Sequence, residues 1–160
     1  MLKQGDLDAV LLALPLNEEN ITELVLFEEP FLFAAATAHP KAKQRSVTLK
    51  DLEDEEVLLL EDGHCLRDQA LDVCNTHRAV ENTSFRATSI ETLRQMVAAN
   101  AGITLMPQLA VQKGGGVKYV PFEGRPPHRV IGLCWRTTST RRPLLEELGA
   151  VLKDVVSDAL

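Results

Sequence analysis

The sequence predicts an α/β fold with a largely parallel sheet. Apolar runs of strand length alternate along the chain with stretches of helical periodicity, a pattern typical of α/β proteins. The 160 residues, 45% of them apolar, suffice for one domain or for two small domains that share a sheet. The chain has no internal repeat and no low-complexity tract.

We expect strands where short apolar or alternating runs end at glycine, proline or acidic residues. These runs cover residues 8–14, 21–27, 31–38, 57–60, 85–88, 103–106, 117–122 and 129–136. The sequence Glu28-Glu29-Pro30 is expected to separate the second strand from the third, because proline cannot donate to a strand ladder.

Helices are expected where the apolar spacing changes to the helical period and capping residues precede it. They cover a short helix at 49–52, a helix that begins at Cys65, a helix at 90–99, a turn at 108–112 and a closing helix at 144–160. Thr48 is predicted to cap the first of these helices, and Thr88 with Glu91 has capping-box spacing before the third.

Charge and composition exclude several classes of function. A net charge of −6 argues against DNA binding by this chain, because phosphate contacts need clustered Lys and Arg. No apolar run approaches the ~20 residues of a membrane span, and the first residues lack the apolar centre of a signal peptide. Three irregularly spaced cysteines do not suggest a secreted disulfide scaffold. We therefore expect a cytoplasmic protein with reduced thiols and no membrane partner.

The most informative segment is residues 60–74, which contains two of the three cysteines. Cys65 follows an acidic-Gly-His turn and is expected at a helix N-terminus, between His64 and Arg67. Free backbone N–H groups and nearby cations favour a thiolate there, and the thiolate is the nucleophilic form of cysteine.

Cys74 lies nine residues further on. In one continuous helix the two thiols would lie on opposite faces, roughly 13–14 Å apart along the axis. A disulfide requires Cα atoms within about 7 Å of each other. The two cysteines can therefore join only if the segment between them unwinds, which outlines a redox switch.

Each of these residues also has a purely structural interpretation. Cys65 could be an inert half-buried cysteine, and Cys74 a core residue, since free cysteine is among the most buried residue types. Cys134 lies in an apolar strand and is interpreted as structural. A zinc site would need His64, Cys65, Cys74 and His77, whose spacing fits none of the usual patterns, so we expect no metal.

The segments around the cysteines resemble the hydrogen-peroxide-sensing activators among the LysR-type transcription regulators. The matching residues are 60–70, Cys74, 85–89, 91–94, 96–99 and 102–105, and residues 5–14 resemble the Gly-x-Leu-Asp strand entry of the family. The resemblance extends over nearly the whole chain.

The resemblance implies a fold like that of type 2 periplasmic binding proteins, with two α/β subdomains. Regulatory subdomain I would comprise residues 1–28 and 129–160 and would be incomplete, lacking its first strands and first helix. Subdomain II would comprise residues 29–128 and carry the redox cysteines. The intact protein would form a homo-oligomer and bind DNA only through an N-terminal domain absent from this sequence.

The resemblance also implies the chemistry. Hydrogen peroxide would oxidise Cys65 to a sulfenic acid, and Cys74 would convert it to a disulfide that refolds the intervening segment. A cellular disulfide reductant would restore the thiols. The domain would need no cofactor, and it would be a stoichiometric redox sensor rather than an enzyme.

Four further residues would support the chemistry of the two cysteines. His64 would orient the pocket, and Arg129 matches a family arginine thought to approach the reactive thiol. Arg67 and Asp68 are also named as supporting residues, although a solvated helix face would explain both.

Two further functions remain open. Thr88 and Ser89 open a helix, as in domains of this family that bind small anionic effectors, although a helix cap explains both residues. An effector domain that binds a small anionic metabolite is therefore the main alternative function. A thiol peroxidase is the enzymatic alternative, and the absence of Cys-x-x-Cys counts against a disulfide reductase.

Overall fold

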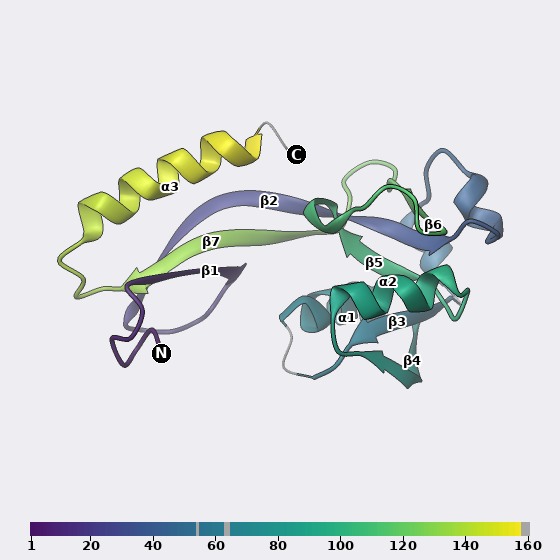
Figure 1. Cartoon of the computed structure of the whole chain (residues 1–160), viewed down its shortest axis with the longest axis horizontal. Coiled ribbons are helices and arrows are strands. Elements are labelled where there is room, and N and C mark those ends of the chain that lie inside the picture. The colour runs from purple at the N-terminus through teal and green to yellow at the C-terminus, as the bar shows by residue number, and fades with distance from the viewer. Residues whose placement is uncertain (54, 63–64, 158–160) are drawn as a thin grey trace. The chain divides into compact units, whose positions relative to one another are not determined.

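The computed structural model describes residues 1–53, 55–62 and 65–157, and the chain forms two compact units (Figure 1). The first unit contains Met1–Glu29 and Arg129–Leu160, and the second contains Pro30–His128. Strand β2 (Ile21–Ala36) leads from the first unit into the second, and strand β7 (His128–Arg136) leads back.

Strand β2 is continuous through Pro30, so the predicted break at Glu28-Glu29-Pro30 is wrong. The fixed φ of proline is compatible with extended backbone, and its ring costs the strand only one ladder donor. Glu29 is fully buried, although a charged residue next to proline was expected in an exposed connection between two strands. Glu29 belongs to the first unit, which therefore ends one residue later than the expected boundary at residue 28.

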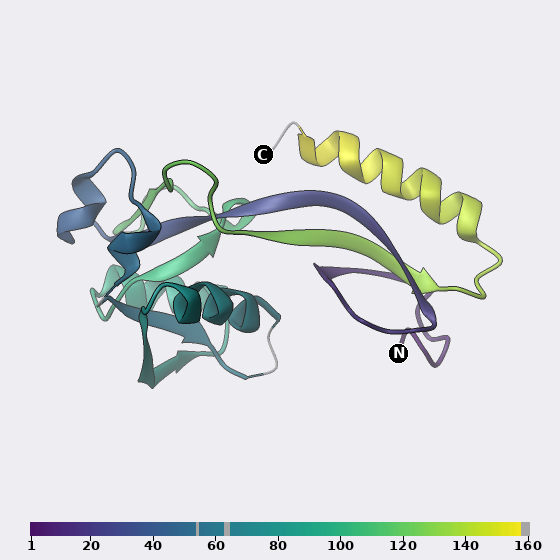
Figure 2. The ribbon, with the colours of Figure 1, turned by 180° about the vertical axis from the view of Figure 1, so that it is seen from behind.

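In the first unit, strand β1 (Ala9–Leu14) pairs antiparallel with β7, and helix α3 (Arg142–Ser157) runs beside β2 and β7 (Figures 1 and 2). Leu145 of α3 belongs to the core of this unit and Leu152, seven residues later on the same face of the helix, packs against it. The core of this unit consists of Leu26, Leu133, Trp135 and Leu145.

In the second unit, β2 pairs antiparallel with β5 (Thr104–Pro107) and β6 (Val117–Val120). Strand β3 (Glu56–Leu60) pairs parallel with β4 (Val80–Ala87). Helix α1 (Cys65–Thr76) connects β3 to β4, and helix α2 (Ile90–Ala98) follows β4. Figures 1 and 2 show these two helices from opposite sides, with α2 nearer the viewer in Figure 1.

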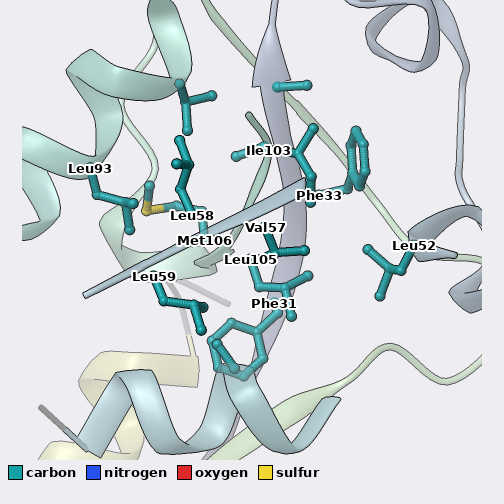
Figure 3. Close-up of a cluster of buried hydrophobic side chains, with 14 of the residues drawn as sticks. Phe31, Phe33, Leu52, Val57, Leu58, Leu59, Leu93, Ile103, Leu105 and Met106 are labelled. Atoms are coloured by element: carbon teal, nitrogen blue, oxygen red, sulfur yellow. The ribbon is translucent and has the colours of Figure 1, made fainter. Parts of the chain in front are cut away.

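The larger core lies in this second unit (Figure 3). Most of its buried side chains come from β2, β3, β5 and α2, and two come from a 3₁₀ helix and from the residue before β5. They include Phe31, Phe33, Leu52, Val57, Leu58, Leu59, Leu93, Ile103, Leu105 and Met106. Helix α1 adds Leu66, Ala70 and Cys74 to it, at i, i+4 and i+8.

The predicted largely parallel sheet is wrong for the pairs that involve β1, β2, β5, β6 and β7. The β1–β7, β2–β5 and β2–β6 pairs are antiparallel, whereas β3–β4 is parallel. Alternating strands and helices imply parallel pairing only where sequence neighbours share a sheet through a crossover helix, as β3, α1 and β4 do. The partners of β2 come from distant parts of the chain.

Several local predictions differ from the structure by a few residues. Strand β4 begins at Val80 rather than residue 85, and α3 begins at Arg142 rather than residue 144. A 3₁₀ turn, Pro40–Lys43, follows β2, where the sequence predicted no helix. Thr48, the predicted cap, precedes the 3₁₀ helix Leu49–Leu52, and its backbone N–H donates to the Asp51 carboxylate at 2.7 Å. No helix in the described ranges is long and apolar enough to span a membrane.

Candidate functional site

Helix α1 positions both cysteines of the candidate site. The helix begins at Cys65, whose side chain is exposed, and its buried face includes Cys74. Cys65 therefore lies where the first backbone N–H groups of the helix have no helical partner and the dipole is positive. The start of a helix is a place where proteins commonly bind anions.

The described helix is continuous from Cys65 to Thr76, and Cys65, Cys74 and Cys134 are free thiols. At 1.5 Å per residue the two α1 cysteines lie about 13–14 Å apart along the axis. This distance is about twice the Cα separation that a disulfide tolerates. Joining these cysteines requires several residues of α1 to leave the helical conformation.

The two buried thiols are held in the protonated form. Burial raises the pKa of Cys74 to about 11, and the negative charge of Glu81 contributes to the same shift. Burial also raises the pKa of Cys134 to about 11, with a further contribution from Glu23. Neither thiol is a ready nucleophile near neutral pH, because the thiolate is the reactive form.

Arg67 belongs to a network of four charged residues, which we call the α1 charge ring: Asp62, Arg67, Glu81 and Arg86. Arg67 Nε donates a hydrogen bond to Asp62 at 2.8 Å, and Arg67 Nη1 donates one to Glu81 at 2.8 Å. Arg86 donates to Asp62 at 2.8 Å and lies 3.4 Å from the Glu81 carboxylate. The ring joins the end of β3 to the first turn of α1 and to β4.

The suggestion that Arg67 belongs to a solvated helix face is wrong, because its side chain is buried. Its guanidinium pairs with two carboxylates, and these partners raise the pKa of Arg67, with Glu81 the largest cause. Asp68, by contrast, is exposed in the first turn of α1. His64 lies outside the described residues.

Arg129 is in the first unit, where it binds the buried carboxylate of Glu29. Its Nε donates to Glu29 Oε2 at 2.7 Å, and its Nη2 lies 2.6 Å from the same oxygen. A fully buried carboxylate needs such a partner, since an unpaired buried charge is costly. The proposed approach of Arg129 to Cys65 remains a prediction.

Ser89, not Thr88, caps α2. The Ser89 hydroxyl accepts a hydrogen bond from the backbone N–H of Thr92 at 3.1 Å, and Thr88 is exposed one residue earlier. The predicted Thr88–Glu91 capping box is therefore wrong, because the N-cap lies one residue later, at Ser89. The Ser89 hydroxyl therefore already occupies one of the free N–H groups of α2 to which an anionic effector would bind. The effector role of Thr88 and Ser89 remains a prediction.

The space beneath the first turns of α1 is small. A cavity of about 10 Å³ lies between the helix and the strands, lined by Leu66, Arg67, Ala70 and Leu105 among others. This volume holds at most one water molecule. Among the described residues, no group of three or more histidine, cysteine or acidic side chains is arranged to bind a metal.

Asp62, Glu81 and Arg86 are the members of the α1 charge ring that sequence reasoning missed. Glu81 is fourteen residues from Arg67, and no local spacing rule connects a charge on a helix with a charge on the next strand. The order of elements gave only a weak indication of this contact. Because β4 follows α1 directly, a parallel β3–α1–β4 unit would bring β4 beside the helix.

The fold agrees with what is found in known proteins. The chain belongs to the LysR substrate binding domain family, whose family model matches residues 1–157. This match and the solved structures below confirm the predicted α/β fold of the type 2 periplasmic-binding-protein kind.

Within that family the chain is similar to OxyR. It is 48% identical over 155 residues to the DNA-binding transcriptional dual regulator OxyR of Escherichia coli K12, covering 95% of this chain and 51% of that protein. The chain thus spans about half the length of the curated relative.

Two solved OxyR structures match the fold closely. The reduced form of OxyR superposes with a TM-score of 0.85 at 46% identity, covering 96% of this chain and 73% of that one. The oxidised form gives a TM-score of 0.84 at 49% identity, covering 96% and 74%. The predicted resemblance to the peroxide-sensing branch of the family is confirmed.

Proposed function

We propose that this chain is the peroxide-sensing regulatory part of a LysR-type transcription activator, with Cys65 and Cys74 as its redox pair. The observation that carries the proposal is the arrangement of α1, which has an exposed thiol at its first residue and a buried thiol nine residues later. The similarity to OxyR in both reduced and oxidised forms supports the same assignment.

The proposed chemistry has two steps. The Cys65 thiolate attacks one oxygen of hydrogen peroxide, the O–O bond breaks, and hydroxide leaves as the sulfenic acid forms. The Cys74 sulfur then attacks the Cys65 sulfur, the S–O bond breaks, and the departing hydroxide takes the thiol proton to form water. Two thiols and one peroxide thereby give one disulfide and two waters, and a dithiol reductant reverses the change.

The disulfide is the bistable element of the proposed switch. Because the cysteines are too far apart in a continuous α1, the oxidised state needs a different conformation of this segment. The two compact units would correspond to regulatory subdomains I and II, with DNA binding by a separate domain of the intact, homo-oligomeric cytoplasmic protein. In this proposal the product that matters is the changed conformation of α1, which makes the domain a sensor rather than a turnover enzyme.

His64, Arg67, Asp68 and Arg129 are proposed as supporting residues of this chemistry. Arg67 supports it through the α1 charge ring, whose contacts hold the first turn of α1 next to β4. Asp68 is exposed on the same turn, and Arg129 is held by Glu29 in the first unit.

Peptide mass mapping of the reduced protein, before and after one equivalent of hydrogen peroxide, tests the proposal. We expect a Cys65–Cys74 crosslink and a free Cys134 thiol, with the same result in Cys134→Ser and no crosslink in Cys65→Ser. Intact thiols after exposure would contradict the proposal. Stabilisation by a small anionic metabolite independent of Cys65 would favour an effector domain, and many turnovers with a reductant would favour a thiol peroxidase.

A further inference from the structure

A hollow lies beside the second half of α1, which we call the α1 hollow. Its lining comes from the last turns of α1 with His77, from residues 125–128 and from Leu49, all of them in the second unit. Its volume is about 410 Å³, which is within the range of small-molecule sites.

The two walls of the α1 hollow are held differently. Val73 and Thr76 lie on either side of Cys74 in α1, so this wall is lost when Cys74 leaves the helix. The opposite wall is tied to β2, because the Pro127 carbonyl accepts a hydrogen bond from the N–H of the fully buried Phe31 at 2.8 Å. Two adjacent prolines with fixed φ make this wall stiffer. The α1 hollow therefore has its full lining only while the last turns of α1 are helical.

The lining combines half-buried apolar groups with charged groups nearer the solvent. Leu49, Val73 and the two prolines are half-buried, whereas Arg125 and Asp72 are exposed. An apolar lining with a few polar groups is typical of sites for small organic ligands. The apolar side chains are aliphatic, so they suit the body of an aliphatic ligand.

The charged groups of the lining favour a single carboxylate. Arg125 Nη2 lies 3.4 Å from His128 Nε2, and His128 Nδ1 lies 3.2 Å from the Pro126 carbonyl oxygen, so a guanidinium and an imidazole lie side by side. The planar guanidinium fork matches the geometry of a carboxylate. Asp72 on the other wall repels a second negative charge, so a monocarboxylate fits better than a dicarboxylate or a phosphate.

We infer that the α1 hollow binds a small aliphatic monocarboxylate, and that this ligand holds the last turns of α1 in the helical conformation. The carboxylate binds Arg125, and the apolar body lies against Leu49 and Val73. Because the complete site exists only in the helical state, binding stabilises that state by linkage.

This ligand differs from the effector of the alternative function, which would bind at Thr88 and Ser89 and would need no disulfide. The effect of the ligand on the Cys65–Cys74 disulfide rests on the proposed function, whereas binding to the α1 hollow does not.

The first test is an NMR titration of the reduced, ¹⁵N-labelled protein. The probe is cyclohexanecarboxylate, and cyclohexanecarboxamide is its uncharged analogue of nearly the same shape. We expect the acid to shift the amide signals of Val73, Thr76 and Arg125 and to bind at least about tenfold more tightly than the amide. Equal affinities for the two probes would overturn the carboxylate assignment. The absence of saturable binding, or shifts confined to the N-terminus of α2, would overturn the site.

Arg125→Gln tests the charged group, and Arg78→Gln is its matched control. Both arginines are exposed, and Arg78 directly follows His77 but is not among the described residues that line the α1 hollow. Arg125→Gln should weaken binding of the acid at least about tenfold and leave binding of the amide unchanged, whereas Arg78→Gln should change neither. Equal losses in the two variants would mean that the acid responds to general positive charge, and would overturn the role of Arg125.

Hydrogen exchange of the reduced protein tests whether the ligand holds α1. At about ten times the Kd of cyclohexanecarboxylate, exchange in the last turn of α1 should become about tenfold slower, because the open fraction falls by 1 + [L]/Kd. The amides of β1, in the other unit, should exchange at an unchanged rate. Unchanged exchange in α1 would overturn the proposed restraint. This measurement needs no peroxide.

Addition of hydrogen peroxide tests the consequence for the switch. The same concentration of cyclohexanecarboxylate should slow formation of the Cys65–Cys74 disulfide about tenfold in wild type and leave it nearly unchanged in Arg125→Gln. An unchanged rate in wild type would overturn the coupling. If wild type forms no disulfide even without the probe, the proposed function is refuted, and the titration and the exchange measurement still decide whether the α1 hollow is a binding site.

Discussion

Cys74 and Cys134 are both buried thiols, but the elements that carry them are held in different ways. Burial raises the pKa of each to about 11. Cys134 lies on β7, the strand between β1 and β2, where it pairs with Val10. Cys74 lies on α1, whose first turn is tied to β4 by the buried Arg67–Glu81 pair. Burial alone therefore does not distinguish a structural cysteine from a candidate redox cysteine, whereas the anchorage of its element does.

The largest expected effect is on backbone protection after oxidation. If the Cys65–Cys74 disulfide forms, α1 has to unwind, so its amides should exchange at least about a hundredfold faster in the oxidised protein. The amides of β7 around Cys134 should keep their protection, because no thiol chemistry reaches that strand. Hydrogen exchange with mass spectrometry measures both segments in one sample. Equal protection of the α1 amides in the two redox states would contradict the prediction that α1 unwinds while β7 does not.

The next prediction concerns the stability of β7, the strand that carries Cys134. A Cβ added at Gly132 would overlap the Leu14 Cδ1 atom and lie 2.9 Å from Leu14 Cγ and 3.1 Å from the Leu24 carbonyl oxygen. We expect Gly132→Ala to lower the free energy of unfolding by about 1–3 kcal/mol, as overpacking does. Urea denaturation measures this change.

The matched variant is the double mutant Gly132→Ala, Leu14→Ala. It should lose less stability than the sum of the two single changes, because the smaller side chain removes most of the overlap. Under conditions where Gly132→Ala stays folded, its rate of Cys65–Cys74 crosslinking should equal that of wild type. A slower crosslink would mean that β7 takes part in the switch.

The raised pKa values of both buried thiols predict a pH-dependent stability with a definite sign. The folded state retains the thiol protons up to about pH 11, whereas an unfolded cysteine loses its proton near 9, so stability falls as pH rises through this window. Two pKa units correspond to roughly 2–3 kcal/mol per thiol. Denaturation of reduced wild type, Cys74→Ala and Cys134→Ala from pH 8 to 11 measures the slopes. Each variant should lose less stability over the window, and identical slopes in all three proteins would contradict the assignment.

The smallest effect compares neighbouring hydroxyl groups at the N-terminus of α2. Ser89 supplies the cap, so Ser89→Ala should cost about 1 kcal/mol of unfolding free energy, a typical value for a lost N-cap. Thr88→Ala should be close to neutral, because Thr88 is exposed outside the helix. Thermal denaturation measures both variants. A larger loss for Thr88→Ala would restore the capping box expected from the sequence.

Predictions based on local spacing agree with the structure more closely than predictions that needed a distant partner. The helix that begins at Cys65 and the Thr48 cap were predicted from residues within a few positions of each other, and so were the strands at 8–14 and 57–60. The structure has these two strands at Ala9–Leu14 and Glu56–Leu60, within one residue of the prediction. The continuity of β2 through Pro30 and the antiparallel pairing of its partners were not predictable in this way. They depend on strands that come from elsewhere in the chain.

The order of residues 60–74 is enough to show that two thiols lie nine residues apart on one helical segment, with the first at its start. Helical geometry then places them on opposite faces whatever surrounds them. The tertiary structure alone decided that Arg67 is buried and that Glu81 reaches it from β4. Residues fourteen apart come into contact only when β3, α1 and β4 pack together. Buried charges require partners at contact distance, and where each charge finds its partner is a property of packing rather than of local spacing.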